Sequence, residues 1–126
     1  MQAANILVVD DDELRAMLQE ALKAWGHQVV AARSGGQALE LAKTHVVDIV
    51  LCDLSMPGMG GLELLKRMKE LYGVIDFVMM TGYPDVATAV EALKHGAYDY
   101  LQKPLLLDDL RHLIGRLAER RFLRQE

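Results

Sequence analysis

Acidic, hydroxyl and amino side chains stand at or just after the ends of four short apolar runs in the sequence. They are, in chain order, Asp10, Asp11, Asp12, Asp53, Thr81 and Lys103. Carboxylates are hard oxygen ligands, and Mg²⁺ prefers one or two of them together with water and phosphate oxygens. A lysine adds compact positive charge, and a carboxylate can itself attack phosphorus. If these side chains meet, they could hold Mg²⁺ and accept a phosphoryl group.

Each of these residues alone has an ordinary structural interpretation. An acid after a strand is often only the N-cap of the next helix, and Asp12 suits that role or a place in the first helical turn. The whole set is harder to explain in this way, because it combines acids, a hydroxyl and a lysine at separate strand ends. We therefore interpret the set as functional.

The elements that position this set follow from the hydrophobic pattern. Five short runs, rich in β-branched residues and without alternation, are typical of strands buried on both faces. They span residues 6–9, 28–32, 48–52, 77–80 and 98–101. The last run is the weakest and suits a strand at the edge of the sheet. Strict alternation of such strands with helices predicts an α/β fold.

Helical spacing of apolar residues marks the five stretches between and after the strands. The second, fourth and fifth helices are expected to begin near Ser34, Pro84 and Asp108, with Ser34 as an N-cap. Leu14 and Leu62 are the first apolar positions on the buried faces of the first and third helices. In the fourth helix we expect Asp85 in the first turn and a buried face made by Ala89, Val90 and Leu93. The complete pattern predicts a five-stranded parallel, doubly wound, flavodoxin-like sheet of order 2-1-3-4-5, with ligands at the carboxyl ends of its strands.

Composition narrows the class of protein further. A chain of 126 residues suits one domain, and its net charge of −4 argues against non-specific binding to nucleic acid. The single cysteine excludes an internal disulfide, and the acidic start of the chain does not fit a signal peptide. With no apolar run long enough for a membrane span, we expect a soluble cytoplasmic protein. We expect all four histidines at the surface: His27, His45, His95 and His112.

Four segments together resemble the receiver domain of two-component response regulators. They are ILVVDDD at 6–12, VLCDLSMPGMGGLELL at 50–65, MMTGYPD at 79–85 and GAYDYLQKP at 96–104. Each segment is weak evidence alone, but all four occur in order on the expected strand and helix pattern. One departure is Gly60, which stands where many members have an aspartate and which we expect to alter only the loop before the third helix.

The resemblance implies a role for each acid. Asp53 would accept a phosphoryl group from a sensor histidine kinase, and Mg²⁺ would be the cofactor. Asp10 and Asp11 would form the acidic pair. Asp11 and Asp53 would bind the metal directly, with the backbone carbonyl of Ser55 as the third protein ligand and Asp10 behind them.

The resemblance also implies a conformational switch. Thr81 would turn its hydroxyl toward the phosphoryl group, Lys103 would pair with that group, and the ring of Tyr100 would swing inward as Thr81 moves. Phosphorylation would thereby repack the surface of the fourth helix, fifth strand and fifth helix. Ser55 and Tyr83 flank the site, and we expect them to modulate access, with Tyr83 slowing hydrolysis of the acyl phosphate. Such a protein is regulatory rather than an enzyme, although it assists its own phosphorylation and dephosphorylation.

Residues 81–104 look most like the receivers of NtrC-type transcriptional activators, in which an AAA+ ATPase and a DNA-binding module follow. We therefore expect residues 1–119 to form the receiver and residues 120–126 to start a helical linker to a missing output domain. The chain would then be an excised fragment. A free-standing receiver is the alternative.

The C-terminal stretch carries a basic run and an apolar stripe. The basic residues are Arg111, Arg116, Arg120, Arg121 and Arg124. Interspersed acids and apolar positions favour a solvated helix face over direct contact with nucleic acid. Because the family often dimerises through its last helices, the stripe of Leu110, Ile114, Leu117 and Phe122 is consistent with the seam of a homodimer.

Two other functions fit part of the pattern. A haloacid-dehalogenase-like phosphatase would use Asp10 as nucleophile and Asp12 as acid/base. It is disfavoured by Leu14, which replaces the usual Thr or Val, and by the lack of an acidic pair after a later strand. A receiver that acts as a phosphorylation-independent binding module would not need the complete polar set.

Overall fold

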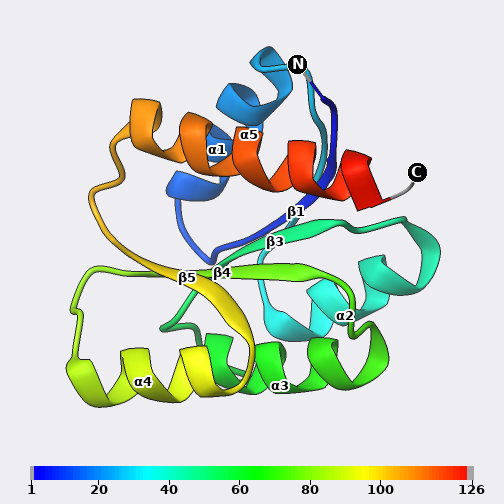
Figure 1. Ribbon diagram of the computed structural model, residues 1–126. Helices are drawn as coiled ribbons and strands as arrows, with labels where there is room; N and C mark the ends of the chain where they lie inside the picture. Colours follow the sequence, from blue (N-terminus) through cyan, green and yellow to red (C-terminus); the bar gives the residue numbers. More distant parts are fainter. Residues whose placement is uncertain (1, 125–126) are drawn as a thin grey trace.

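Residues 2–124 are described in a computed structural model, and they form ten alternating elements (Figure 1). The strands are β1 (Asn5–Val9), β2 (Gln28–Ala32), β3 (Ile49–Asp53), β4 (Asp76–Thr81) and β5 (Ala97–Gln102). The helices are α1 (Leu14–Ala24), α2 (Gly35–Thr44), α3 (Gly61–Leu71), α4 (Val86–Lys94) and α5 (Leu107–Arg124).

All five strands pair in parallel in the order β2-β1-β3-β4-β5. The predicted fold class is therefore confirmed, and β5 lies at an edge of the sheet as expected. Every expected strand is present, with ends that differ from the prediction by at most one residue. This order brings the carboxyl ends of β1, β3, β4 and β5 to the same side of the sheet.

Two layers of helices cover the sheet, α1 and α5 on one face and α2, α3 and α4 on the other (Figure 1). Successive residues along a strand pack against opposite helix layers. In β1, Ile6 and Val8 pack with α1 and α5, whereas Leu7 and Val9 pack toward the second layer. Because both faces are buried, the strands read as continuous apolar runs rather than alternating ones. Cys52 also lies in the second core, away from the solvent.

Two helix starts differ in how well the sequence predicted them. Ser34 is the N-cap of α2, and its hydroxyl accepts a hydrogen bond from the Gln37 amide at 3.1 Å. The prediction that Asp85 lies in the first turn of α4 is wrong. Asp85 is the N-cap, since its carboxylate accepts from the Ala87 amide and the Thr88 hydroxyl. Capping satisfies amide groups that have no partner within the helix.

The predicted buried face of α4 is also wrong. Val90 and Leu93 are each 50 % exposed, and Ala89 is only half-buried. The fully buried residue of this helix is Ala92. Because α4 lies over the edge strand β5, the sheet covers only a narrow stripe of the helix, and a small side chain fits there. Large apolar side chains therefore remain on the solvent side.

His27 is not a surface residue, contrary to the prediction. It is 6 % exposed, and its Nδ1 accepts a hydrogen bond from the Ala4 amide at 3.1 Å. That amide lies just before β1, where it needs a partner outside the strand. Burial lowers the pKa of the imidazole below its ordinary value of 6.5. His45, His95 and His112 are exposed, as expected.

The apolar stripe of α5 cannot serve as a dimer seam. Leu110, Ile114 and Leu117 belong to the core beneath the helix, where the sheet and α1 cover them. Phe122 remains 43 % exposed at the far end of the helix. Leu110, Ile114 and Leu117 thus form a contiguous stripe that packs in the core of the single chain.

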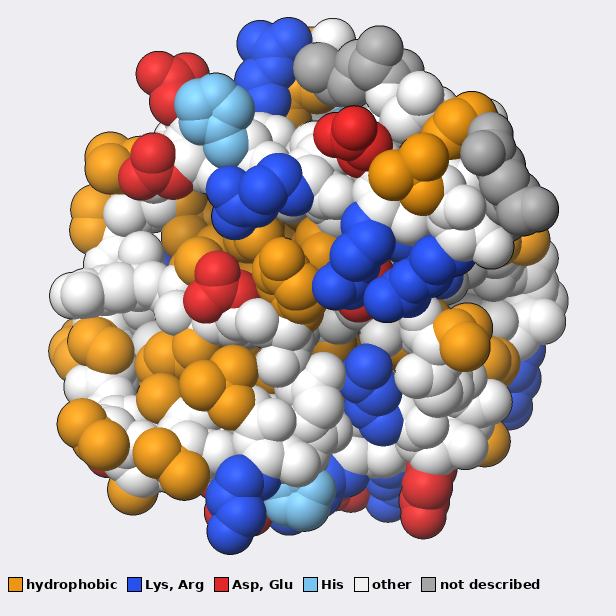
Figure 2. Space-filling view, in the orientation of Figure 1, with side chains coloured by type: hydrophobic (Ala, Val, Ile, Leu, Met, Phe, Trp, Pro, Cys, Tyr) orange, Lys and Arg blue, Asp and Glu red, His pale blue; other side chains and the backbone are white. Residues whose placement is uncertain are grey.

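Two arginines of α5 hold the helix to the amino-terminal edge of the sheet. Arg120 donates to Asp76 Oδ1 at 2.5 Å, and Arg121 donates to Asp76 Oδ2 at 3.1 Å and lies 3.6 Å from Asp48 Oδ1. We call these four residues the basal cluster. The expectation of a solvated basic run is therefore wrong for Arg121, whose side chain is 15 % exposed, whereas Arg120 is ion-paired but 39 % exposed. Figure 2 shows basic side chains gathered where α5 passes over the sheet.

The helix α5 continues without interruption across the expected boundary between residues 119 and 120. That boundary stays a prediction. Within the described part of the chain, residues 2–124, no helix combines the length and the apolar character that crossing a membrane requires.

Candidate functional site

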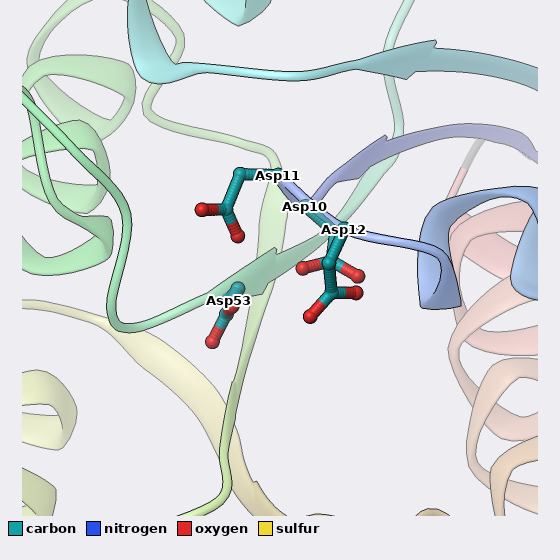
Figure 3. A group of neighbouring side chains, drawn as sticks. All are labelled: Asp10, Asp11, Asp12 and Asp53. Atoms are coloured by element: carbon teal, nitrogen blue, oxygen red, sulfur yellow. The ribbon is translucent and has the colours of Figure 1, made fainter.

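Four carboxylates gather at the carboxyl ends of β1 and β3, and we call them the acidic rim: Asp10, Asp11, Asp12 and Asp53. One oxygen atom of each lies within 4.8 Å of one oxygen atom of each of the others. The register of the sheet explains this meeting, because Val9 pairs with Cys52, so that the acids that follow them are neighbours. Figure 3 shows the first three acids leaving the end of β1 above Asp53 at the end of β3.

Asp10 is the most deeply buried of the four acids. Its side chain is fully buried, and neither carboxylate oxygen has a hydrogen-bond partner among residues 2–124. Burial raises the pKa of Asp10 to about 7. The neighbouring carboxylates of Asp12 and Asp53 act in the same direction, whereas the Lys103 ammonium opposes them. A buried carboxylate without donors is costly, and a cation would relieve that cost.

Lys103 supplies the positive charge closest to the rim. Its Nζ lies 3.2 Å from Asp53 Oδ2 and 3.8 Å from Asp10 Oδ1. The residue follows β5 directly. Its amide donates to the Thr81 carbonyl at 2.7 Å, and this bond holds the backbone from which the side chain extends. The peptide bond between Lys103 and Pro104 is cis. One ammonium therefore faces two of four carboxylates.

Asp53 is held by close packing of the segment that follows it. The Gly61 amide donates to the Leu54 carbonyl at 2.9 Å, so α3 begins directly against the end of β3. A Cβ on Gly61 would lie 2.5 Å from the Asp53 carbonyl oxygen, closer than real side chains allow. Ser55 is exposed, and its amide lies 3.4 Å from Asp53 Oδ1. Only glycine at position 61 leaves room for this strand-to-helix contact.

The remaining predicted residues surround the rim at different depths. Thr81 is buried at the end of β4, and its hydroxyl accepts from the Tyr83 amide at 3.1 Å. The Tyr83 side chain is 89 % exposed and does not cover the site. The ring of Tyr100 already packs against the second core, and its buried hydroxyl has no partner among residues 2–124. The structure thus gathers Asp53, Lys103 and the acids, and leaves Tyr83 outside.

Two residues of the site were underestimated from the sequence. Asp12 lies one position before the N-cap site that Glu13 occupies, yet its Oδ1 accepts from the Leu14 amide at 2.9 Å. That amide is the main reason that the pKa of Asp12 is lowered. Asp12 therefore belongs to the rim as well as to the helix start. Arg15, which the sequence did not single out, donates from Nη1 to the Asp10 carbonyl at 2.8 Å.

The donor set of the rim fits a hard divalent cation. It offers carboxylate oxygens only, with no sulfur or imidazole ligand among the clustered groups. The acids outnumber the nearby cations, and the two oxygens of Asp10 lack donors. The residues present are thus consistent with Mg²⁺.

A family model described as "response regulator receiver domain" matches residues 6–115. The chain belongs to this family. It is 51 % identical over 107 residues to the transcriptional regulatory protein ZraR of Escherichia coli (strain K12), a match that covers 84 % of this chain and 24 % of ZraR. It is 38 % identical over 117 residues to the DNA-binding transcriptional regulator NtrC of Klebsiella pneumoniae, over 92 % of this chain and 25 % of NtrC.

Among solved structures, a response regulator receiver domain protein from Clostridium thermocellum superposes with a TM-score of 0.88 at 30 % identity, covering 95 % of this chain and 98 % of that one. The recognition of a receiver most like those of NtrC-type activators is therefore confirmed. The chain spans about a quarter of the length of the curated relatives described above.

Proposed function

We propose that this receiver accepts a phosphoryl group on Asp53 from a sensor histidine kinase. The observation that carries the proposal is the ion pair between Lys103 and Asp53 within a rim of four acids. Asp53 retains slight exposure at the surface, whereas the Asp10 side chain is fully buried. A nucleophile must be reachable by the donor, so this difference favours Asp53 over Asp10.

Asp11, Asp53 and the Ser55 carbonyl would hold Mg²⁺, with Asp10 behind them. The ion would neutralise charge on phosphoryl oxygens when bound. The unpartnered oxygens of Asp10 and the all-oxygen donor set support this assignment. Lys103 would pair with a phosphoryl oxygen, for which its ammonium is suited.

In the transfer step, a carboxylate oxygen of Asp53 attacks the phosphorus of a phosphohistidine. The new O–P bond forms as the P–N bond breaks, and the imidazole nitrogen takes the electron pair. Lys103 stabilises charge on the transferred group. The product is an acyl phosphate, which water later hydrolyses to restore the carboxylate. The receiver assists both steps but is regulatory.

The switch would follow from the position of Thr81. Its hydroxyl would leave the Tyr83 amide to donate to the phosphoryl group, and Tyr100 would adjust beside it. Thr81 ends β4 beside β5, and Tyr100 lies in β5, so the change would repack the surface of α4, β5 and α5. That surface would control an output domain, an AAA+ ATPase with a DNA-binding module by analogy with NtrC-type relatives, and could support a homodimer.

The decisive experiment is intact-mass analysis after incubation with acetyl phosphate and Mg²⁺. We expect the wild type to gain one phosphoryl group and Asp53→Asn to gain none, with peptide mapping that places the group on Asp53. Glu70→Asn, which removes an exposed acid on α3, is the matched control and should be modified like the wild type. A group that persists in Asp53→Asn, or that maps to Asp10 as in a dehalogenase-like phosphatase, overturns the proposal.

A further inference from the structure

Arg15 makes a contact that reaches the backbone of the acidic rim rather than its carboxylates. The residue is the second of α1 and is half-buried. Its Nη1 donates to the carbonyl oxygen of Asp10 at 2.8 Å. The amide of Asp10 donates to the Ala32 carbonyl of β2 at 3.1 Å. Asp10 is therefore anchored on both sides of its backbone, once by the sheet and once by Arg15.

The anchored carbonyl belongs to the peptide group that joins Asp10 to Asp11. A peptide group is planar, so a carbonyl fixed in direction also fixes the amide nitrogen of the next residue. At this point β1 has ended, and the sheet no longer constrains the chain. The Arg15 guanidinium thus takes over, one residue beyond β1, the role that a neighbouring strand plays within the sheet.

We propose that Arg15 is a positioning residue that fixes the peptide plane between Asp10 and Asp11 and thereby aims Asp11 at Asp53 for Mg²⁺ binding. This inference rests on the proposed function, because it assumes that the rim holds the metal. Asp11 is exposed, so packing does little to hold its side chain. Groups that orient metal ligands typically account for 10- to 100-fold in affinity when they are removed.

The charge of Arg15 makes the proposal easy to separate from a purely electrostatic role. A cation beside four acids repels Mg²⁺, so loss of that charge alone would tighten Mg²⁺ binding. Loss of positioning weakens it instead. The two roles predict opposite signs for the same substitution.

The test is a Mg²⁺ titration by isothermal calorimetry on the whole chain, with wild type, Arg15→Ala and Arg15→Lys. We expect Arg15→Ala to bind Mg²⁺ about 10-fold more weakly. Arg15→Lys keeps a donor and should recover part of the affinity. Arg33→Ala removes an exposed arginine that follows β2 at the same edge of the sheet, and it should bind at least as tightly as the wild type.

Two further measurements guard the conclusion. Urea unfolding without metal should show that Arg15→Ala is folded, and the amide resonances of Asp11 and Asp12 should shift more in Arg15→Ala than in Arg33→Ala. Equal or tighter Mg²⁺ binding by a folded Arg15→Ala overturns the inference. If the wild type itself binds no Mg²⁺, the proposed metal site fails. If the wild type and all variants bind Mg²⁺ with the same affinity, the metal site stands and only the role of Arg15 is rejected.

Discussion

Both edges of the sheet bury aspartates beside basic side chains, but the two sets are balanced differently. In the basal cluster, both oxygens of Asp76 accept from arginines, and Asp48 accepts from the amide and the side chain of Asn5. In the acidic rim, Lys103 pairs with only two of the four carboxylates, and both oxygens of Asp10 lack hydrogen-bond donors among residues 2–124. The Asp76 carboxylate is thus fully paired at one edge, although Nε of Arg120 and Nε of Arg121 lack hydrogen-bond partners among residues 2–124. The Asp10 carboxylate at the other edge has no hydrogen-bond donor.

The comparison teaches how to separate structural from functional charge. A buried acid whose oxygens all have donors stabilises one arrangement of the chain. A buried acid without donors costs free energy, so it marks a candidate site for a ligand or for acid–base chemistry. The imbalance, rather than the presence of aspartates, distinguishes the acidic rim.

The largest effect is expected at the balanced edge. Asp76→Ala leaves Arg120 and Arg121 without their shared acid, and we expect the free energy of unfolding to fall by about 3 kcal/mol. Glu70→Ala, at an exposed position on α3, should change it by less than about 0.5 kcal/mol. Urea unfolding measures both. Equal small changes in the two variants would show that the basal cluster contributes little.

At the acidic rim, removing the charge of a buried aspartate is expected to raise the free energy of unfolding rather than lower it. Because the pKa of Asp10 is raised from 3.8 to about 7, the folded protein holds a proton that the unfolded chain releases between these pH values. This contribution to stability is present at low pH and is lost as pH rises to 7. At pH 7.5 without metal, the free energy of unfolding of Asp10→Asn should therefore be about 1–3 kcal/mol higher than that of the wild type. A variant less stable than the wild type would contradict the destabilising effect assigned to the charged Asp10 carboxylate.

The pH dependence of Mg²⁺ binding should reflect the same raised pKa of Asp10. Below pH 7, Mg²⁺ must compete with the proton on Asp10, so its affinity should fall by up to about 10-fold per pH unit. Calorimetry at pH 6, 7 and 8 measures this dependence. Asp10→Asn cannot release that proton and should show a much flatter profile. A wild-type affinity that is constant from pH 6 to 8 would exclude the coupling.

The smallest expected effect concerns His27, which is buried but satisfied. Its lowered pKa means that the unfolded chain binds a proton more readily, so stability is lost as pH falls below 6.5. His27→Gln should reduce the acid-induced loss by under about 1 kcal/mol, whereas His112→Gln, at an exposed position, should not. Urea unfolding of each variant at pH 7.5 and 5.5 gives the difference. Identical pH dependence in both variants would rule out a role for His27.

The sequence predicted the fold and the gathering of the rim for a geometric reason. Parallel strands end at one edge, so Asp10, Asp53 and Lys103 were expected on the same side of the sheet once the alternation of strands and helices was recognised. The family resemblance supplied their expected roles. The contact of Arg15 with a backbone carbonyl was not predictable in this way, because it depends on how α1 is oriented at its first turn.

The errors lie where burial depends on a partner element. The apolar residues Val90 and Leu93 of α4 have helical spacing, but the narrow edge of the sheet buries Ala92 instead. His27 looked like any polar residue before a strand, and its burial follows from the open amide of Ala4. Arg120 and Arg121 looked solvated, because their partners lie 44 and 45 residues away in the chain.

The tight contact of Gly61 with the end of β3 has a consequence for how the molecule can diversify. Residues 54–60 leave and return at one point, closed by the hydrogen bond from Gly61 to Leu54. The loop is thus closed at its base, and beyond Ser55, whose amide lies at the Asp53 carboxylate, its tip lies apart from the strand that carries Asp53. Substitutions at its tip would leave the position of Asp53 unchanged. The outer part of this loop can therefore vary in sequence without moving the end of β3.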